Sequence, residues 1–491
     1  MSRNIIIGAA VGILVLGLTR GINWPFVGPN AGNMNMFSLA ARNYLKFGYI
    51  KTKFLPVVEV YDRLPDEPKQ YVHHPPLLPL TISILFRVFG DNYRSARLSQ
   101  VWPVGITGIV LYVLAKEWWG IKAAGWTLAA FGLIPATTVF GRNTGLESMT
   151  IMWIVLIAWA AAKKRIGWAV LFTCLGTLTD WPAAYFAGWM ALGLWLDGKR
   201  RQSLTIFLAA LGTGAIFLAY VGIMAGGLGK IGSGITIPAG FWWKWIGIFG
   251  IRWGVYFGLI GLIGLIGLIG LIKNKIVFAL AAFAATNMVL YPGWSFGHPY
   301  WIYYFVPVIA LAAGYKLNKI ANIWVMVIII FLVIGQWGGV EKWKTGQVAA
   351  NLGRADLAQK ADQLIPKGET LMVNPGGVID GDIWQFHTGR RFMPIRADAA
   401  IGRNELKYYV FSCSGCSGIG PEGYGLEVFR YQMLAVRGWR AWIFDLEEKA
   451  SSPDMSILAR GYEADVRRGI RATGVKGWMQ NITEVLQVPQ I

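Results

Sequence analysis

The feature that most constrains the fold of this chain is a series of apolar segments separated by short connections that contain Lys and Arg. A membrane-spanning helix needs about 20 apolar residues, and several segments reach or approach that length. Trp and Tyr stand at many segment ends, as in the aromatic belts of membrane interfaces. The sequence therefore predicts a polytopic α-helical membrane protein with about 11 transmembrane helices. They are expected at residues 4–22, 98–115, 122–139, 148–162, 166–179, 182–196, 203–224, 251–272, 276–291, 301–315 and 320–337.

The distribution of charge divides the chain into two parts. Lys and Arg outnumber Asp and Glu by 46 to 26, which gives a net charge of +20, but only 15% of the residues are charged. Residues 1–337 carry 27 basic and nine acidic side chains, whereas residues 338–491 carry 19 and 17. We interpret the excess as a topology signal and expect no nucleic-acid partner. Residues 1–337 are predicted to form the membrane part and residues 338–491 a soluble domain.

Whether segment 77–90 spans the membrane decides on which side the predicted connections lie. The segment is apolar, but at about 1.5 Å per residue it reaches only ~20 Å, and it contains Pro79 and Arg87. If it does not span, five basic connections fall on the same side as Arg3, which the positive-inside rule assigns to the cytoplasm. They lie at residues 116–122, 163–165, 199–201, 273–275 and 316–319. We therefore predict an interfacial helix at 77–90 within a long first outer loop, residues 23–97, in a multi-pass protein of the plasma or inner membrane. Its N-terminal segment is expected to be an uncleaved membrane anchor with the N-terminus in the cytoplasm, and its C-terminal domain to lie outside.

The C-terminal domain alternates helical and strand patterns. Residues 347–363 are predicted helical, and residues 370–374, 391–395 and 407–412 are predicted strands, which indicates an α/β or α+β fold. Cys413 and Cys416 are spaced for a disulfide, but one such pair with His387 does not complete a metal site. In the membrane part, residues 258–272 repeat Gly-Leu-Ile, a pattern typical of helix packing or lipid contact rather than chemistry.

Polar side chains gather in four of the predicted outer loops. His73 and His74 precede two prolines, and an imidazole there can meet a phosphate or orient a hydroxyl. The alternative is an interfacial turn that tolerates His. Next, Arg142 and Glu147 bracket a turn, where Glu147 is either a site acid or a carboxylate favoured by the helix dipole. Asp180 is likewise a site acid or a helix cap.

The fourth loop places His298, Tyr300, Tyr303 and Tyr304 at the start of a predicted helix, where interfacial aromatics are an alternative explanation. Because all four loops are predicted on one side, they indicate a shared outward-facing cavity. Basic and imidazole groups suit an anionic lipid head group, and carboxylates suit a general base acting on an acceptor hydroxyl.

The order of these motifs resembles the GT-C superfamily of membrane glycosyltransferases. The branch most similar contains the protein O-mannosyltransferases and the lipid A aminoarabinose transferase. The resemblance covers residues 1–337 and rests on ARNYLKFG at 41–48, HHPPLLPL at 73–80, Phe89-Gly90 before Arg97-Leu98, GRNTGLES at 141–148, LTDWP at 178–182 and HPYWIYY at 298–304.

The resemblance implies an enzyme that takes a sugar from a polyprenyl-phosphate carrier in the bilayer. It transfers the sugar, usually with inversion, to a hydroxyl or amine of an acceptor on the outer face. The acceptor, whether protein, lipid or glycan, stays unidentified. The resemblance assigns no metal ligand and leaves a divalent cation open as a cofactor.

The resemblance also implies roles for single residues. Glu147 matches the acid of the family's second outer loop, and His73 and His74 occupy the place of its donor-binding pair. Tyr300, His298, Arg42, Arg97 and Arg142 are the further candidates for donor-phosphate or substrate binding.

One position departs from the pattern, because Asn33 stands where the family has an Asp. An amide cannot act as a general base, which leaves three alternatives. Glu147 or Asp180 takes that role, or the protein transfers no sugar, or another acid of the first loop folds into the site. The candidates in that loop are Glu59, Asp62, Asp66 and Glu67. We favour Glu147.

Two other functions stay open. A transporter or flippase of lipid-linked sugars carries polar groups near the bilayer midplane and often repeats its fold internally. Here the acids gather at the predicted outer ends, and no repeat is found beyond the Gly-Leu-Ile tract. The other alternative is a catalytically silent family member that acts as a partner, which Asn33 would explain.

Overall fold

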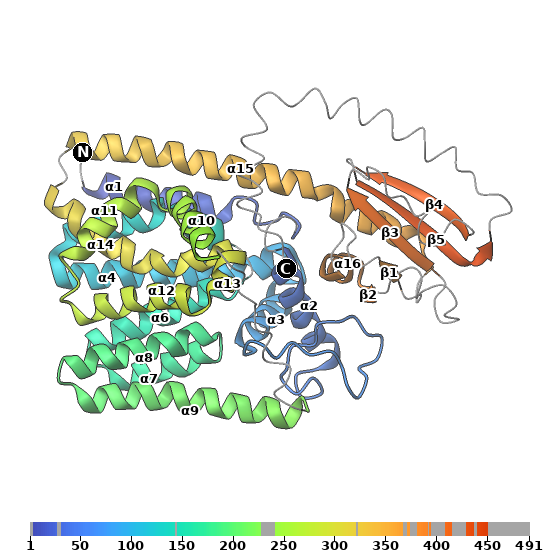
Figure 1. Ribbon diagram of the computed structural model, residues 1–491, viewed down its shortest axis with the longest axis horizontal. Helices are drawn as coiled ribbons and strands as arrows, with labels where there is room; N and C mark the ends of the chain where they lie inside the picture. The colour runs from blue at the N-terminus through green and yellow to red at the C-terminus, as the bar shows by residue number, and fades with distance from the viewer. Residues whose placement is uncertain are drawn as a thin grey trace.

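The computed structural model describes residues 3–26, 31–142, 145–226, 241–320, 323–366, 371–373, 381–390, 392–393, 408–414, 429–436 and 439–449. Long helices lie side by side in a bundle, and a small sheet lies beyond one end of it (Figure 1). The helices are α1 (Arg3–Thr19), α2 (Ala31–Phe47), α3 (Leu77–Phe89), α4 (Tyr93–Leu133), α5 (Pro135–Phe140), α6 (Glu147–Ala162), α7 (Ile166–Thr177), α8 (Trp181–Leu196), α9 (Arg200–Met224), α10 (Phe241–Tyr256), α11 (Gly258–Ile269), α12 (Lys275–Leu290), α13 (Pro292–Gly297), the 3₁₀ helix η1 (Pro299–Phe305), α14 (Val306–Ile320), α15 (Ile323–Leu364) and α16 (Gly381–Thr388).

The number of membrane spans stays a prediction. By length and apolarity alone, α4 and α9 suffice to cross a membrane, and the pair α10–α11 would add a third if it forms one span. Shorter apolar helices, α3, α6, α7 and α12, coincide with other predicted segments. The predicted helix at 77–90 is confirmed as α3, which exposes Ile84 and Val88 on one face. That apolar face fits the interfacial placement, which also stays a prediction.

The helix breaks in the structure agree with the prediction at one place and differ from it at another. The helix α4 covers both 98–115 and most of 122–139, and its break at Gly120, whose φ is 85°, lies in the predicted connection between these two segments. The predicted single helix at 251–272 is wrong, because α10 and α11 meet at an angle of 106°. Gly258 lies in the left-handed region at the bend, and Gln336 donates from Nε2 to two carbonyl oxygens at the end of α10. Along α11, Gly264 and Gly267 pack closely against α14.

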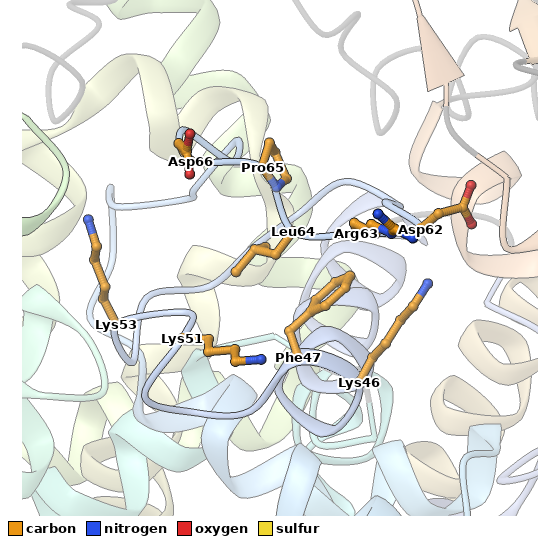
Figure 2. A pocket seen from close by; sticks show the side chains of 9 residues that line it. All are labelled: Lys46, Phe47, Lys51, Lys53, Asp62, Arg63, Leu64, Pro65 and Asp66. Atoms are coloured by element: carbon orange, nitrogen blue, oxygen red, sulfur yellow. The ribbon is translucent and has the colours of Figure 1, made fainter.

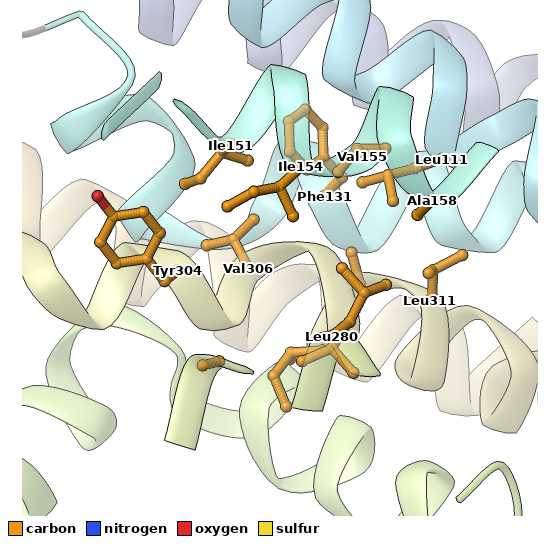
Figure 3. Close-up of a cluster of buried hydrophobic side chains, with 14 of the residues drawn as sticks. Leu111, Phe131, Ile151, Ile154, Val155, Ala158, Leu280, Tyr304, Val306 and Leu311 are labelled. Atoms are coloured by element: carbon orange, nitrogen blue, oxygen red, sulfur yellow. The ribbon is translucent and has the colours of Figure 1, made fainter. Parts of the chain in front are cut away.

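The core of the bundle is a buried apolar cluster between α4, α6, α12 and α14 (Figure 3). Phe131, Val155 and Leu311 contribute to it and are fully buried. A second buried cluster joins the first loop (residues 23–97) to α15 and α16 through Phe26, Leu357 and other side chains. Burial of each large apolar side chain contributes about 1.5–3 kcal/mol, so this second cluster fixes the first loop against the C-terminal part.

The C-terminal part contains a mixed sheet of five strands: β1 (Leu371–Val373), β2 (Phe392–Met393), β3 (Tyr408–Ser414), β4 (Phe429–Val436) and β5 (Trp439–Lys449). Their order is β2-β1-β3-β5-β4, with β1 parallel to both neighbours and β5 antiparallel to both. The three predicted strands are thereby confirmed. The helix α15 runs from the bundle to the sheet across the predicted boundary at 337–338 (Figure 1), and the division into two domains stays a prediction. Cys416 lies outside the described residues, so the disulfide also stays a prediction.

Candidate functional site

A cavity of about 590 Å³ lies where the first loop meets α6, α8, α12 and η1. Seven of the ten residues predicted for the site line it: Asn33, His73, His74, Glu147, Asp180, His298 and Tyr300. The remaining lining side chains are mostly aromatic or aliphatic, and they include Tyr71, Trp294 and Tyr304. Such a wall, apolar with a few convergent polar groups, is typical of a small-molecule or cofactor site.

Asp180 joins two parts of the chain at the floor of the cavity. It caps the N-terminus of α8, where its Oδ1 accepts from the Trp181 backbone N–H at 2.9 Å. The same oxygen lies 2.7 Å from Nδ1 of His74, and Oδ2 accepts from the Tyr304 hydroxyl at 3.3 Å. Only 4% of the Asp180 side chain is exposed, so the carboxylate is fully engaged. The pairing assigns the proton to Nδ1 of His74 and leaves its Nε2 for other contacts.

His73 and His298 lie on an aromatic surface of the cavity. The ring of His298 stacks between Trp294, at a centroid distance of 5.2 Å, and Tyr300, at 5.0 Å. His73 lies 5.9 Å from the Trp294 ring, and its backbone carbonyl accepts from Trp181 Nε1 at 2.8 Å. Burial, with Arg252 and His74 nearby, lowers the pKa of His298 to about 4. His298 is therefore neutral at pH 7, with one N–H to donate.

Glu147 is the first residue of α6 and lines the same cavity as Asp180. No described side chain hydrogen-bonds to its carboxylate. The carboxylate lies directly over Gly145, which has no side chain to displace it. Apart from the hydrogen bond that it accepts from its own backbone N–H, the Glu147 carboxylate therefore keeps acceptor positions that Asp180 has already used.

Asn33 enters the cavity from α2, and its Nδ2 donates to the Tyr300 hydroxyl at 3.3 Å. None of the four first-loop acids considered as substitutes for the missing Asp lines the cavity: Glu59, Asp62, Asp66 and Glu67. Glu59 instead pairs with Lys69 at 3.1 Å. The cavity thus has Glu147 and Asp180 as its carboxylates among the described residues.

Two predicted arginines bind backbone rather than the cavity. Arg142 is buried and donates to the carbonyl oxygens of Gly17, at 2.8 Å, and Arg20, at 2.9 Å, at the end of α1. Arg97 is also buried and donates to carbonyl oxygens within residues 22–25. Each guanidinium offers five N–H donors and so fastens an irregular chain segment to a helix.

Arg42, the third predicted arginine, lies between the first loop and α16. It pairs with Asp91 through two nitrogens, at 2.5 and 3.1 Å, and donates to the Phe386 carbonyl oxygen at 2.8 Å. Its guanidinium also lies over the Phe386 ring at 4.3 Å. Like the other two arginines, it is not among the described residues that line the cavity.

Several lining residues were not predicted. The Tyr71 ring stacks on His74 at 5.8 Å, and Trp294 separates His73 from His298. Asn287, in the wall formed by α12, is buried, and its amide has no hydrogen-bond partner among the described residues. Tyr71 stands two residues before the His pair, which was a usable signal, whereas Asn287 lies inside an apolar segment without one.

A divalent cation at this site stays a prediction. Among the described residues, no three His, Cys, Asp or Glu side chains cluster as metal ligands. Asp180 is occupied by His74 and Tyr304, and an amide stands at position 33.

Known proteins share part of this sequence and most of this fold. The family model described as dolichyl-phosphate-mannose-protein mannosyltransferase matches residues 73–224, which carry the His pair, Glu147 and Asp180. ArnT from Cupriavidus metallidurans in the apo state superimposes with a TM-score of 0.61 at 12% identity, covering 89% of this chain and 97% of that one. This chain has the GT-C fold. The predicted resemblance to the GT-C superfamily is confirmed.

Other GT-C structures superimpose as well. ArnT from the same organism bound to undecaprenyl phosphate gives a TM-score of 0.58 at 12% identity, with 89% and 97% of the two chains covered. The archaeal oligosaccharyltransferase AglB from Archaeoglobus fulgidus, in complex with an inhibitory peptide and a dolichol-phosphate, gives 0.54 at 13% identity, with 84% and 69% covered. No curated protein sequence matches this chain.

Proposed function

We propose that this GT-C protein is a glycosyltransferase that moves a sugar from a polyprenyl-phosphate donor to a hydroxyl or amine of an acceptor. The observation that carries the proposal is the convergence of Glu147, the Asp180–His74 pair, His73 and His298 on one cavity. The solved ArnT structure with undecaprenyl phosphate and the AglB structure with a dolichol-phosphate support this class of donor. The unpartnered amide of Asn287 in the same wall supports a ligand that forms hydrogen bonds.

Glu147 is the proposed general base. Its carboxylate takes the proton of the acceptor O–H or N–H as the acceptor atom attacks the anomeric carbon of the donor sugar. The new bond forms on the opposite face from the breaking bond between the anomeric carbon and the phosphate oxygen, so the configuration inverts. The electron pair of that bond leaves with the polyprenyl phosphate. Asp180 is less suited to the role because its two oxygens already accept three hydrogen bonds.

The imidazoles are the proposed phosphate contacts. Asp180 holds His74 with Nδ1 toward itself, so the ring is oriented before the substrate arrives. His298 stacks on Trp294 and His73 packs against the same ring at a tilt, and an imidazole N–H can donate a hydrogen bond to a phosphate oxygen. Preorganised donors around a leaving group stabilise the charge that develops on it. The cavity is proposed to lie on the outer side of a multi-pass membrane protein.

The test is a transfer assay with the full-length protein in membranes, supplied with a polyprenyl-phosphate donor that carries a radiolabelled sugar. Glu147→Gln keeps the size of the side chain and removes the base, so transfer should fall by about 10²–10⁴-fold. The matched control is Glu117→Gln, which removes an acid that pairs with Lys163 far from the cavity. Transfer at the wild-type rate in Glu147→Gln would remove Glu147 from the mechanism. Absence of any labelled product with the wild-type protein, together with movement of the intact donor between leaflets, would instead favour a flippase.

A further inference from the structure

A second hollow, a groove of about 750 Å³, opens on the surface of the first loop and shares no lining residue with the cavity (Figure 2). Its sides are Lys46, Phe47, Lys51 and Lys53 on one segment and Asp62, Arg63, Leu64, Pro65 and Asp66 on the other. The four cations outnumber the two carboxylates. The groove therefore favours an anionic ligand.

Hydrogen bonds hold the turn that carries Lys51 and Lys53 in a defined conformation. Lys53 and Phe54 both lie in the left-handed region, with φ of 54° and 49°, which is costly for residues other than glycine. The turn is held by backbone hydrogen bonds from Lys53 N to Ile50 O, at 2.9 Å, and from Phe54 N to Tyr49 O, at 2.8 Å. The Tyr44 hydroxyl donates to the Phe54 carbonyl at 2.9 Å. A strained turn with this much support holds its side chains in fixed places.

The groove lies at the end of a candidate membrane span. The Tyr220 hydroxyl of α9 donates to the Lys53 carbonyl at 2.6 Å, and Lys53 Nζ donates to the Met224 carbonyl at 3.1 Å. Met224 is the last residue of α9, which is one of two helices among the described residues that are long and apolar enough to cross a membrane by themselves. A group bound beside the end of such a helix lies at the level of the lipid head groups.

Exposed apolar side chains lie on this turn and at the end of α9. Ile50, at the tip of the turn, is 84% exposed, Phe54 is 46% exposed, and Ile223 of α9 is 77% exposed. Apolar tips beside Lys side chains match the boundary between acyl chains and phosphates, where the apolar part is buried and the ammonium group stays among the head groups.

We propose that this groove binds the phosphate head group of an anionic lipid, with Lys51 and Arg63 as its principal cations. Neither side chain forms a hydrogen bond or an ion pair with any described residue, so both are available to a ligand. Ile50 and Phe54 then enter the acyl-chain region of the same leaflet. The site is separate from sugar transfer, because none of these residues lines the cavity.

The experiment measures lipid binding by the purified full-length protein in detergent, using native mass spectrometry with phosphatidylglycerol and with phosphatidylcholine. The test variant is Lys51→Gln with Arg63→Gln. Its affinity for phosphatidylglycerol should be roughly 30-fold lower, because each basic residue near an anionic membrane surface contributes about 1 kcal/mol and about 1.4 kcal/mol is a factor of ten. Phosphatidylcholine should bind weakly to both proteins.

The matched control, Lys116→Gln with Lys122→Gln, removes two exposed lysines elsewhere and should bind phosphatidylglycerol like the wild type. The charge-conserving variant Lys51→Arg with Arg63→Lys should also retain binding, which separates lost charge from misfolding. Equal phosphatidylglycerol affinity in the test variant and the wild type would overturn the proposal. Inorganic phosphate that binds with the same dependence on Lys51 and Arg63, while the lipid does not, would overturn the lipid assignment. Neither outcome depends on transfer activity.

Discussion

His74 and Asp180 lie 106 positions apart in the sequence and meet at 2.7 Å, imidazole Nδ1 to carboxylate Oδ1, on the floor of the cavity. One residue comes from the first loop and the other from the start of α8, so this contact closes the loop onto the bundle. It also fixes the orientation of an imidazole that is proposed to face the leaving phosphate. Asp180 therefore has two separable functions, as a helix cap and as the partner of His74.

These two functions predict different effects for two substitutions at position 180. Asparagine is as good an N-cap as aspartate, so Asp180→Asn should unfold at nearly the wild-type temperature but transfer sugar at least tenfold more slowly. Asp180→Ala should also lose about 0.5–2 kcal/mol of stability, because the cap is removed. Thermal unfolding and transfer rates, measured on the same preparations, separate the effects. Asp197→Asn, at the other end of α8, is the control and should leave transfer unchanged. Wild-type transfer in Asp180→Asn would show that a carboxylate partner for His74 is not needed.

Gly145→Ala tests the position of the Glu147 carboxylate without changing that residue. A methyl group at position 145 would overlap Oε2 of Glu147, so the carboxylate must move. We expect transfer to fall roughly 10²-fold, since misplacement by about 1 Å costs that much, while the protein folds normally. Gly188→Ala is the matched control, because nothing lies within 4 Å of the added atom. Equal transfer rates in the two variants would contradict the assigned place of Glu147.

The histidines predict how stability depends on pH. Burial is the main cause that lowers the pKa of both His298 and His387 to about 4, from 6.5. Between pH 6.5 and 4 the unfolded chain therefore binds more protons than the folded one, so the free energy of unfolding falls as the pH is lowered through this range. The two residues together should account for up to roughly 6 kcal/mol at pH 4.

The measurement is thermal unfolding of the detergent-solubilised protein from pH 7.5 to pH 4. The double variant His298→Gln with His387→Gln should lose less stability over this range than the wild type, because glutamine does not titrate. Parallel curves for the two proteins would contradict the buried, neutral state of these imidazoles.

Arg97 was predicted from the sequence as a donor-binding residue, and the structure predicts a different effect of its loss. Arg97→Gln removes hydrogen bonds to three carbonyl oxygens within residues 22–25, so stability should fall by on the order of 3 kcal/mol. The folded fraction should bind a polyprenyl phosphate with wild-type affinity. Arg94→Gln, an exposed neighbour on the same helix, is the control for stability. A variant with normal stability and weak lipid binding would return Arg97 to the site.

Much of the cavity could be predicted from the sequence because topology alone brings its parts together. His73, Glu147, Asp180 and His298 each stand in a loop that the alternation of spans assigns to one side. Helices that start at the same end of a bundle bring their first residues close together, and no contact needs to be known in advance. The family resemblance then gave these residues expected roles.

The arginines could not be assigned in the same way. In the sequence, an Arg that binds a phosphate and an Arg that binds backbone carbonyl oxygens look the same, because both stand beside a loop. Only the fold shows that Arg142 donates to carbonyl oxygens at the end of α1. The bend at Gly258 could not be predicted from the sequence either, because Gly258 belongs to a regular Gly repeat. Gln336, whose side chain donates to two carbonyl oxygens at the bend, is far away in the chain.

The most direct test of the proposed function is an experimental structure of the full-length protein with a bound polyprenyl phosphate. The account predicts the phosphate inside the cavity, within hydrogen-bonding distance of His73 or His298, with the Glu147 carboxylate on the side where the acceptor enters. A phosphate bound away from these three residues, with the cavity unchanged, would contradict it.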